Sequence, residues 1–573
     1  MRASLAGVAA AWLALAATPA AAISDASGLC GAADDPCVVF TTIPVDDGAV
    51  LDLGARTLEV LSAGRLDVGG GTMTIAAGAV VLRANGRLAG AGGKIFVNTT
   101  GGLRTEDTSR IDVSGPFGGF IQVSAAGDVD VAGILDAQSS GPADGGLVAL
   151  SGAAVSLAGT TRVLVGADQA AGGSVALIAT GPLVVDAPLD ASGGDSGGAI
   201  ECDAQGVALN GRIDITGGPG GAGALIDIRS RGPVTINGPI DGDARGGVLT
   251  GGGLGAELSI LAQGTVDLNG QIDVNGGAPG GEGGLIDISA TGDVTQRGAI
   301  RTRGNGSEGV GGELRITAGG GVTLGDVDVG GGFAANRVLV ASQGVVRLTG
   351  TIAGEPTAQG FGGVVDVTGC VLDMDSTAHV STLGREGRNA LTASGGQMIL
   401  RGTLDAGQEN VLTVRDAAVP PVILGSIKPA PSTVVNPELP PCDPGPGPGE
   451  TTTTTIPFGE CGDPSLAPYD TLLCRLSALR LTLQDASPAS LGGRRTARSL
   501  RRRAARALRA VEVARTGRRV EQKLVAASRQ LGRLLTRVQR GLEKGRLDAT
   551  IGTRLQNLAT QAAAQIEGLR VGS

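Results

Sequence analysis

Aromatic residues are scarce in this chain of 573 residues: they make up 2% of it, with one Trp, one Tyr and seven Phe. Bases of single-stranded nucleic acids stack on aromatic rings, and sugar rings do the same. The scarcity therefore argues against specific nucleic-acid recognition and against a sugar-stacking cleft. Histidine is rarer still, because His379, in STAHVSTLG, is the only one. It has no obvious nucleophile or acid partner in the sequence, and an isolated His is more often structural than catalytic.

Cysteine is also infrequent, with seven in the whole chain. Disulfides can therefore pin local features but cannot be the framework that holds the chain together. Two pairs lie close in sequence, and we expect each to form a disulfide: Cys30 with Cys37, and Cys461 with Cys474. Cys202 and Cys370 fall in separate repeats that are too far apart to be bridged, so we expect both to be free thiols.

Long apolar runs are missing after the first residues: no later stretch reaches the ~20 residues that span a bilayer without a charge, Gly or Pro. The run from Leu5 to Ala17 follows Arg2 and precedes the small residues Ala20 to Ala22. That order is typical of a cleavable secretory signal. We therefore expect a signal peptide at residues 1–22, no transmembrane segment, and a chain that is secreted or held at a bacterial cell surface.

Glycine, in contrast, is abundant, with 100 residues. It recurs in pairs that open similar units, for example GGSVALIATGPLVVDAPLDASGG from Gly172 and GGLIDISATGDVTQRGAIRTRG from Gly283, at a period of 25 to 33 residues. Each unit holds three short segments in which apolar and polar residues alternate, as strands do. Three strands per unit predict a mainly β fold, a right-handed parallel β-helix over residues 48–428. Glycine at the corners would tolerate positive φ and let stacked coils approach closely.

Units of the form GGxIxIxAxGxVxLxGxIDAxGG make this chain resemble the β-helical shafts of bacterial filamentous-haemagglutinin-like, adhesin-like surface proteins. The resemblance covers about Gly48 to Gly425 and is one of repeat style. The Asn-Pro-Asn-Gly signatures of two-partner secretion are not found, so that export route does not carry over. We expect residues 23–47 to form an N-terminal cap, because a solenoid with a bare end exposes edge strands.

Charge divides the chain into two parts. From Gly459 onward there are 22 Lys and Arg against 9 Asp and Glu, whereas the rest has 24 against 46.

Residues 429–458 are rich in Pro and Thr and predict an extended linker. Residues 459–573 show leucines at helical spacing and predict a basic α-helical domain. Its Arg-dense stretch is either a solvated helix face or a site for an extracellular polyanion such as cell-envelope polysaccharide; the arginines concerned are Arg494, Arg495, Arg501, Arg502, Arg503 and Arg506.

Aspartates recur at one outward position of the third strand of the units. The column runs through Asp112, Asp136, Asp190, Asp214, Asp241, Asp273 and Asp328, interrupted by Leu164 and Arg301. Stacked carboxylates could bind a cation, and Asp190, Asp214, Asp241 and Asp273 are the candidates. The simpler interpretation, which we favour, is that each Asp caps the turn that follows it.

No motif indicates a cofactor, and no set of residues indicates catalysis. We therefore expect an exported structural or adhesin-like protein that is not an enzyme. Two alternatives remain open: a polysaccharide-acting β-helix enzyme of the lyase or hydrolase type, and an envelope- or DNA-binding protein that acts through the basic tail.

Overall fold

The structure is a computed structural model of the chain. It divides into two compact units, Met1–Pro446 and Gly447–Ser573, which are described separately. The residues it describes are 21–246, 252–357, 359–440, 442, 472, 475–476, 479–480, 483, 490–491, 493–515, 520–544 and 546–571.

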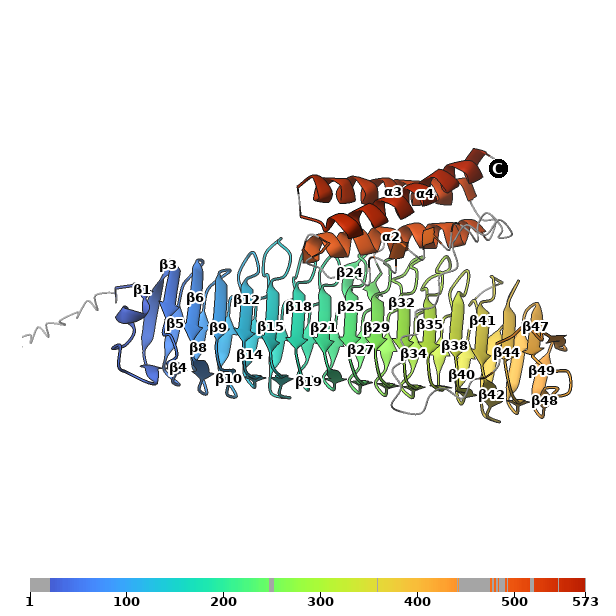
Figure 1. Ribbon diagram of the computed structural model, residues 1–573, viewed down its shortest axis with the longest axis horizontal. Coiled ribbons are helices and arrows are strands. Elements are labelled where there is room, and N and C mark those ends of the chain that lie inside the picture. The colour runs from blue at the N-terminus through green and yellow to red at the C-terminus, as the bar shows by residue number, and fades with distance from the viewer. Residues whose placement is uncertain are drawn as a thin grey trace, which may run out of the picture. The chain divides into compact units, whose positions relative to one another are not determined.

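The first unit is a parallel β-solenoid of about 15 turns, as the glycine-paired repeat predicts. Figure 1 shows the strands stacked along one axis, with one coil of the chain following another. Every pairing between consecutive coils is parallel, and the register is regular except where it shifts in the pairs β1 (Ile23–Asp25) with β3 (Thr42–Asp52) and β24 (Gly217–Pro219) with β28 (Ala244–Arg245). In β32 (Leu285–Ala290), for example, Ile288 pairs with Ile260 of the preceding coil and with Ile316 of the following one.

Three faces surround the interior, and each contributes one strand per coil. Face A consists of β1 (Ile23–Asp25), β3 (Thr42–Asp52), β6 (Thr72–Ala77), β9 (Lys94–Thr99), β12 (Phe120–Ala125), β15 (Leu147–Gly152), β18 (Ser174–Ala179), β21 (Ala199–Ala204), β25 (Leu225–Ser230), β29 (Glu257–Ala262), β32, β35 (Glu313–Ala318), β38 (Arg337–Ser342), β41 (Val364–Gly369), β44 (Arg388–Ala393), β47 (Glu409–Val414) and β50 (Ser432–Val435).

Face B consists of β2 (Cys37–Val39), β4 (Thr57–Val60), β7 (Ala79–Leu82), β10 (Leu103–Thr105), β13 (Val129–Val131), β16 (Val155–Leu157), β19 (Pro182–Val185), β22 (Gly206–Leu209), β26 (Val234–Ile236), β30 (Val266–Leu268), β33 (Val294–Gln296), β36 (Val322–Leu324), β39 (Val345–Leu348), β42 (Val371–Met374), β45 (Met398–Leu400) and β48 (Val422–Ile423).

Face C begins with the first residues of β3, which pair with β5 while the later residues of β3 pair on face A. It continues through β5 (Arg65–Asp67), β8 (Arg87–Ala89), β11 (Arg110–Asp112), β14 (Ile134–Asp136), β17 (Arg162–Leu164), β20 (Leu189–Asp190), β23 (Ile213–Asp214), β27 (Ile240–Asp241), β31 (Ile272–Asp273), β34 (Ile300–Arg301), β37 (Val327–Asp328), β40 (Thr351–Ala353), β43 (His379–Thr382), β46 (Thr403–Ala406) and β49 (Ser426–Lys428). A separate two-stranded pairing joins β24 (Gly217–Pro219) to β28 (Ala244–Arg245).

The interior is one continuous aliphatic core that extends from Ala26 to Val414. Alternation within each short strand sends one side chain in two inward, and inward Val, Leu and Ile repeat at matching positions in successive coils. Each fully buried side chain of this kind stabilises the fold by about 1.5–3 kcal/mol relative to an exposed one. The stabilisation is therefore distributed along the solenoid, because each coil adds buried side chains to the same core.

Close backbone approach is the main reason for the paired glycines. A Cβ on Gly173 would lie 2.1 Å from the carbonyl oxygen of Gly146 in the preceding coil, and yet the φ of Gly173 is not positive. Positive φ is required at fewer positions; Gly280, in the corner GGAPGGEGG, has a φ of 78°. Both expected uses of glycine therefore occur, and close packing is the more frequent one.

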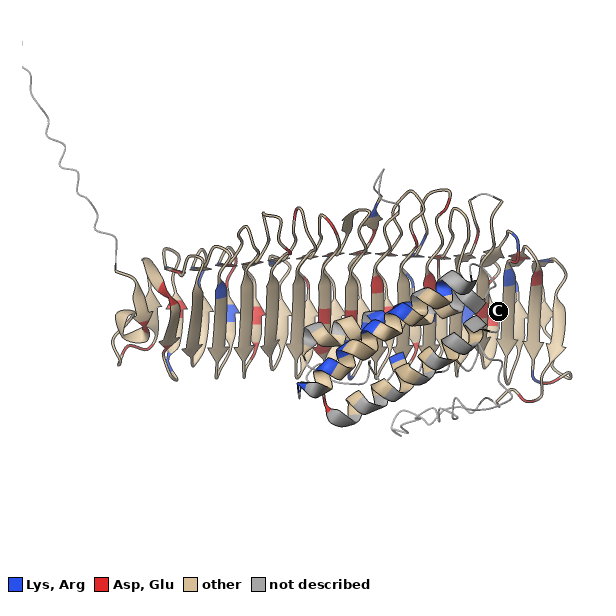
Figure 2. Cartoon of the chain, turned by 90° about the horizontal axis from the view of Figure 1, so that it is seen from above, with Lys and Arg blue, Asp and Glu red and all other residues tan. Residues whose placement is uncertain are grey.

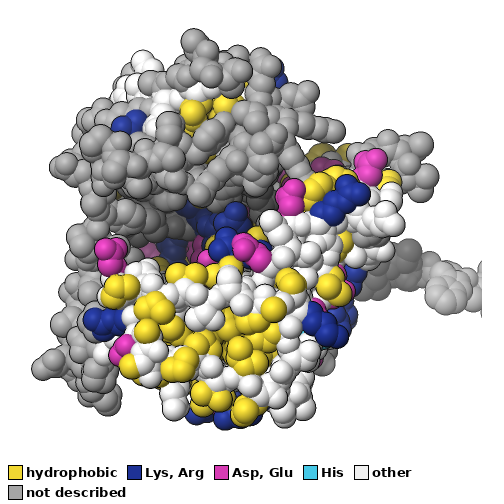
Figure 3. All heavy atoms as spheres, turned by 90° about the vertical axis from the view of Figure 1, so that its right-hand side faces the viewer, with side chains coloured by type: hydrophobic (Ala, Val, Ile, Leu, Met, Phe, Trp, Pro, Cys, Tyr) yellow, Lys and Arg dark blue, Asp and Glu magenta, His cyan; other side chains and the backbone are white. Residues whose placement is uncertain are grey.

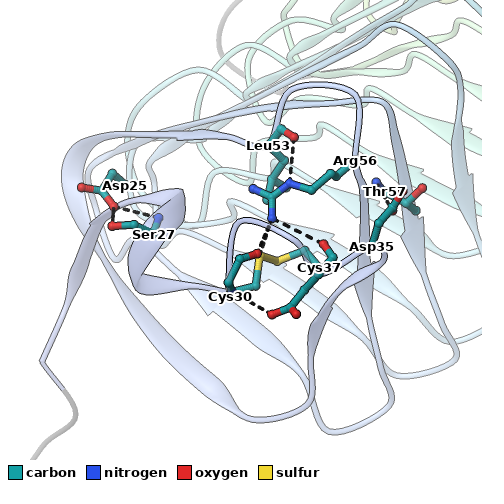
Figure 4. Close-up of a disulfide and its surroundings, with 10 residues drawn as sticks. Asp25, Ser27, Cys30, Asp35, Cys37, Leu53, Arg56 and Thr57 are labelled. Carbon is teal, nitrogen blue, oxygen red and sulfur yellow. Dashed lines mark hydrogen bonds between the residues drawn. A yellow bond between two sulfur atoms is a disulfide. The ribbon is translucent and has the colours of Figure 1, made fainter.

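The N-terminal end of the solenoid begins with β1, η1 (Ala26–Gly28) and β2, and a disulfide joins the residues after η1 to β2 (Figure 4). The predicted disulfide between Cys30 and Cys37 is confirmed, with a Cα–Cα distance of 5.7 Å. The Arg56 guanidinium donates a hydrogen bond to the Gly31 carbonyl (2.6 Å) and so ties the disulfide loop to the next coil. The 3-10 helix η1 (Ala26–Gly28) is capped by Asp25, whose carboxylate accepts the Ser27 amide at 2.8 Å.

The C-terminal end exposes apolar surface among the residues that the structure describes. Its last strands, β48 and β50, leave hydrophobic side chains exposed, and these gather on the end of the solenoid in Figure 3. Strand β50 pairs with β47 in face A, so the solenoid continues into the range predicted as linker. The exposed residues are Val422, Ile423, Leu424, Val434 and Val435.

The expectation of a free Cys370 is wrong: Cys370 forms a disulfide with Cys442, with a Cα–Cα distance of 5.4 Å. Distance along the stack excludes a bond to Cys202, but it does not exclude one to Cys442, which follows the last strand. After β50 the chain returns over earlier coils, and Cys442 reaches Ser394 as well as Cys370. Cys202 is free, as predicted, and it is fully buried.

The second unit is helical, with α2 (Arg494–Arg515), α3 (Val520–Glu543) and α4 (Ala549–Val571). These helices share a core of their own, in which Leu500, Leu524 and Leu555 are fully buried. The predicted disulfide pair Cys461 and Cys474 lies outside the described residues. Among the residues that are described, no helix has both the length and the apolar composition needed to cross a bilayer.

Candidate functional site

Face C carries the predicted aspartate column. Four of its members lie in unbroken parallel register over consecutive coils. In chain order they are Asp190, Asp214, Asp241 and Asp273. Leu164 occupies the same position before them, and Arg301 occupies it after them.

Most of these carboxylates cap the turn that follows them. The Asp190 carboxylate accepts the amide of Ser192 at 3.1 Å, and that of Asp214 accepts the amide of Thr216 at 3.2 Å. A carboxylate that bonds the backbone two residues on stabilises a turn. The capping interpretation of the column is therefore confirmed at these positions.

Arginines of the same face bridge neighbouring aspartates. The Arg212 guanidinium lies 3.2 Å from the Asp214 carboxylate and 3.1 Å from that of Asp241, and Arg301 lies 3.3 Å from Asp273. Burial and the nearby Asp214 carboxylate nevertheless raise the pKa of Asp241. Burial likewise raises the pKa of Asp243, which lies just outside the column.

Cation binding by this column gains no support from the geometry. Within the described part of the chain, no three His, Cys, Asp or Glu side chains are grouped so that they could hold a metal ion. The negative charge of the column is instead offset by backbone amides and arginines.

A column of asparagines follows face B and was not predicted. The Asn237 amide donates to the side-chain oxygen of Asn210 at 2.7 Å, and Asn269 donates to Asn237 at 2.9 Å. Arg297 extends the column by donating to Asn269 at 2.8 Å. The signal was present in the sequence, because an Asn-Gly pair closes the second strand in three consecutive units.

His379 has an acid partner, contrary to the interpretation from the sequence. Its Nε2 lies 3.1 Å from the Asp405 carboxylate, which is one coil further along face C. On the same strand the Ser381 hydroxyl donates to Glu355, not to His379. The four side chains thus form two separate pairs and not a Ser-His-acid relay. Asp405 is 26 residues away from His379, so this pairing can be recognised only when the register between coils is known.

Buried polar residues replace aliphatic ones in the last coils. Asn389 follows Val365 in the register of face A, and Asn410 follows Asn389. Both are almost fully buried, and the Asn389 amide donates to the Asn410 side-chain oxygen at 2.8 Å. Asn410 in turn donates to the Pro429 carbonyl at 2.9 Å. Both buried amide groups therefore have hydrogen-bond partners inside the core.

In the helical unit, the structure describes the side chains of three of the six predicted arginines. Arg501 donates to the Leu483 carbonyl at 2.9 Å, Arg506 is exposed, and Arg503 lines a cavity. The side chains of Arg494, Arg495 and Arg502 lie outside the described residues. Figure 2 shows further Lys and Arg along the helices, which the prediction had not singled out.

The cavity beside Arg503 has a volume of about 530 Å³. Its lining comes from the residues before α2, from α2 and α3, and from the connection to α4. It consists of Leu491, Thr496, Arg503, Arg533, Thr536, Arg537, Arg540, Gly541, Lys544 and Arg546. Six of these ten side chains are cationic and none is acidic. Sequence reasoning placed the basic site on α2, whereas most of the cations around the cavity belong to α3 and the residues after it.

No family model, curated protein or solved structure matches this chain.

Proposed function

We propose that this protein is an exported, non-catalytic scaffold of the bacterial cell surface or extracellular space, adhesin-like in its construction. The solenoid serves as a stiff rod, and the basic helical unit attaches to an extracellular polyanion such as cell-envelope polysaccharide. The observation that carries the proposal is the single hydrophobic core that continues from Ala26 to Val414.

Stiffness follows from bonds between coils. At about 4.8 Å per coil, about 15 turns make a rod of roughly 70 Å. Outward polar side chains on faces B and C bond to partners one coil away, as Asn237 does with Asn210 and Arg212 with Asp241. A surface whose polar groups are engaged in this way favours a structural role over catalysis.

Export is supported by the two disulfides, because such bonds persist in oxidising compartments. The test is to express the full chain in a bacterial host and to fractionate the cells. We expect an oxidised chain outside the inner membrane with an N-terminus near Ile23, measured by mass spectrometry. A variant without residues 2–22 is the control and should remain inside. A full-length chain that stays reduced in the cytoplasm would contradict export.

Attachment to a polyanion is supported by the cations around the helical cavity. Binding to phosphate or sulfate polymers releases counterions and therefore weakens as salt rises. We expect the full chain to be retained on heparin at low salt and released by salt, although its net charge is −9. A chain that flows through at low salt would contradict this part of the proposal.

One observation favours a second candidate, a polysaccharide-acting enzyme: the His379–Asp405 pair lies on the outer face of the rod beside Ser381 and Glu355. The test is to incubate the full chain with acidic polysaccharides and to measure new reducing ends and unsaturated products. The scaffold proposal expects none. Product formation that is lost in His379→Ala and in Asp405→Asn would establish the enzyme instead.

A further inference from the structure

The helical cavity gathers positive charge from α2, α3 and the residues after α3, and its α3 cations are exposed to solvent. Four of its cations lie on α3 and just beyond it, at steps of four, three and four residues, so they share one side of the helix. They are Arg533, Arg537, Arg540 and Lys544. Like charges at this spacing repel and destabilise a helix. A bound anion would remove that repulsion.

Arg503 faces this row from α2. Its Nε atom is shielded from solvent and has no hydrogen-bond partner among the described residues. Burial, followed by the charges of Arg537, Arg533 and Arg506, lowers the pKa of Arg503. An unpartnered, buried donor is costly, and an oxyanion in the cavity would be its natural acceptor.

The side chains that line the cavity indicate which class of anion it would bind. The guanidinium fork matches phosphate oxygens in two-point contacts, and the lining supplies five arginines, one lysine and two threonines. No aromatic side chain lines the cavity, so a nucleobase would find no stacking surface there. The site is therefore suited to the phosphate part of a ligand.

Charge and volume decide how many phosphates the site can take. One phosphate monoester carries about −1.5 to −2 at pH 7, which would leave most of the six cations uncompensated. A cavity of about 530 Å³ lies within the roughly 300–1,000 Å³ of sites that enclose a small ligand. Both values fit a chain of two or more phosphates better than a single ion.

We propose that this cavity binds a phosphate chain, with Arg503 on one side and Arg533, Arg537 and Arg540 on the other. The site deepens the polyanion-binding part of the proposed function and rests on it. It differs in requiring a defined pocket instead of general charge attraction.

The test is isothermal titration calorimetry of the full chain with sodium tripolyphosphate, and with orthophosphate for comparison. The pocket variant is Arg533→Gln with Arg540→Gln, which leaves the hydrogen bond between Arg537 and Ser499 in place. The control is Lys523→Gln with Arg529→Gln, which removes two charges from α3 outside the cavity lining. Thermal melts and circular dichroism of both variants establish that the helices remain folded.

We expect one tripolyphosphate per chain, bound at least tenfold more tightly than orthophosphate. Affinity should fall at least tenfold in the pocket variant and less than twofold in the control. Equal weakening in both variants would overturn the pocket while leaving general polyanion attachment intact. No binding by the unaltered chain would overturn the site, and equal affinity for orthophosphate would overturn the assignment to a phosphate chain. Retention on heparin reports separately on the proposed function.

Discussion

Arg212 bridges Asp214 and Asp241, which occupy the same position in consecutive coils of face C; its Nη2 lies 3.2 Å from one carboxylate and 3.1 Å from the other. The guanidinium thus compensates two acids that the parallel register brings together. The arginine side chain is 57% exposed, so water screens the pair.

Arg212→Gln should lower the free energy of unfolding by about 0.5–1 kcal/mol at low salt, because the two carboxylates then repel without an intervening cation. The loss should shrink in 1 M salt and should also be smaller when Asp241→Asn is present. Urea unfolding of the single and double variants measures the coupling. A loss that does not depend on salt would contradict an electrostatic role.

The pH dependence of Asp241 has a defined sign. Its pKa is raised by burial and then by Asp214, so the folded state holds this proton more tightly than the unfolded state does. The resulting stabilisation is full below the unfolded pKa of about 3.9 and is lost as pH rises through the folded pKa. Asp241→Asn should therefore be more stable than the unaltered chain at pH 7, and the difference should vanish near pH 3. Denaturant unfolding at several pH values tests this; a constant difference would contradict it.

Cys202 should resist alkylation in the folded chain, because burial raises its pKa to about 12 and its side chain is fully enclosed. Iodoacetamide at pH 8, followed by peptide mass spectrometry, should label Cys202 only after denaturation. Cys202→Ser should cost about 1–3 kcal/mol by burying a hydroxyl. Cys202→Val should cost less than about 1.5 kcal/mol, since its neighbours in register are Leu177 and Ile228.

Gly270→Ala should be destabilising by about 1–3 kcal/mol through overpacking. Its Cβ would lie 2.1 Å from the Gly238 carbonyl oxygen of the preceding coil, and backbone cannot move aside as a side chain can. Gly159→Ala is the matched control, because the nearest atoms to its Cβ, those of Asp186, are 4.0 Å away. Its effect should stay within about 0.5 kcal/mol. Equal stabilities for the two variants in denaturant unfolding would count against close coil packing.

Breaking the Cys370–Cys442 disulfide should loosen the last coils. In the chain-entropy description, a crosslink that spans 72 residues is worth about 4 kcal/mol. Cys442→Ser should therefore speed hydrogen exchange in β44, β47 and β50 and leave the first coils unchanged. The double variant Cys30→Ser with Cys37→Ser is the control at the opposite end of the solenoid, because its effect on hydrogen exchange should be confined to the N-terminal residues. Uniform exchange changes along the rod would contradict a local clamp.

The repeat was predictable because a solenoid has the same local environment in every coil. Alternation within strands such as β32 shows which side chains enter the core, and equal spacing between units sets the register. Cys202 pairs in register with Leu177 and Ile228, at a position that is equivalent from coil to coil. Capping by Asp190 and Asp214 was predictable for the same reason, since it acts over two residues.

Contacts that leave the repeat were not predictable in this way. The partner of Cys370 lies beyond the last strand, in a segment whose composition resembles a linker. His379 meets Asp405 only through the coil register, and no local pattern links them. The cations of the helical cavity come from α2, from α3 and from the residues after α3, and their convergence depends on how α2 and α3 pack.

The Cys370–Cys442 bond also determines how a mechanical load enters the rod. A pull on the chain beyond Cys442 passes through the disulfide to Cys370, which lies between β41 and β42, and bypasses the coils formed by β44 to β50. The terminal coils therefore carry no tension, and the pull does not unfold them one after another. The bridge thus transfers force from a covalent tether to the interior of the stack, where many coils resist it together.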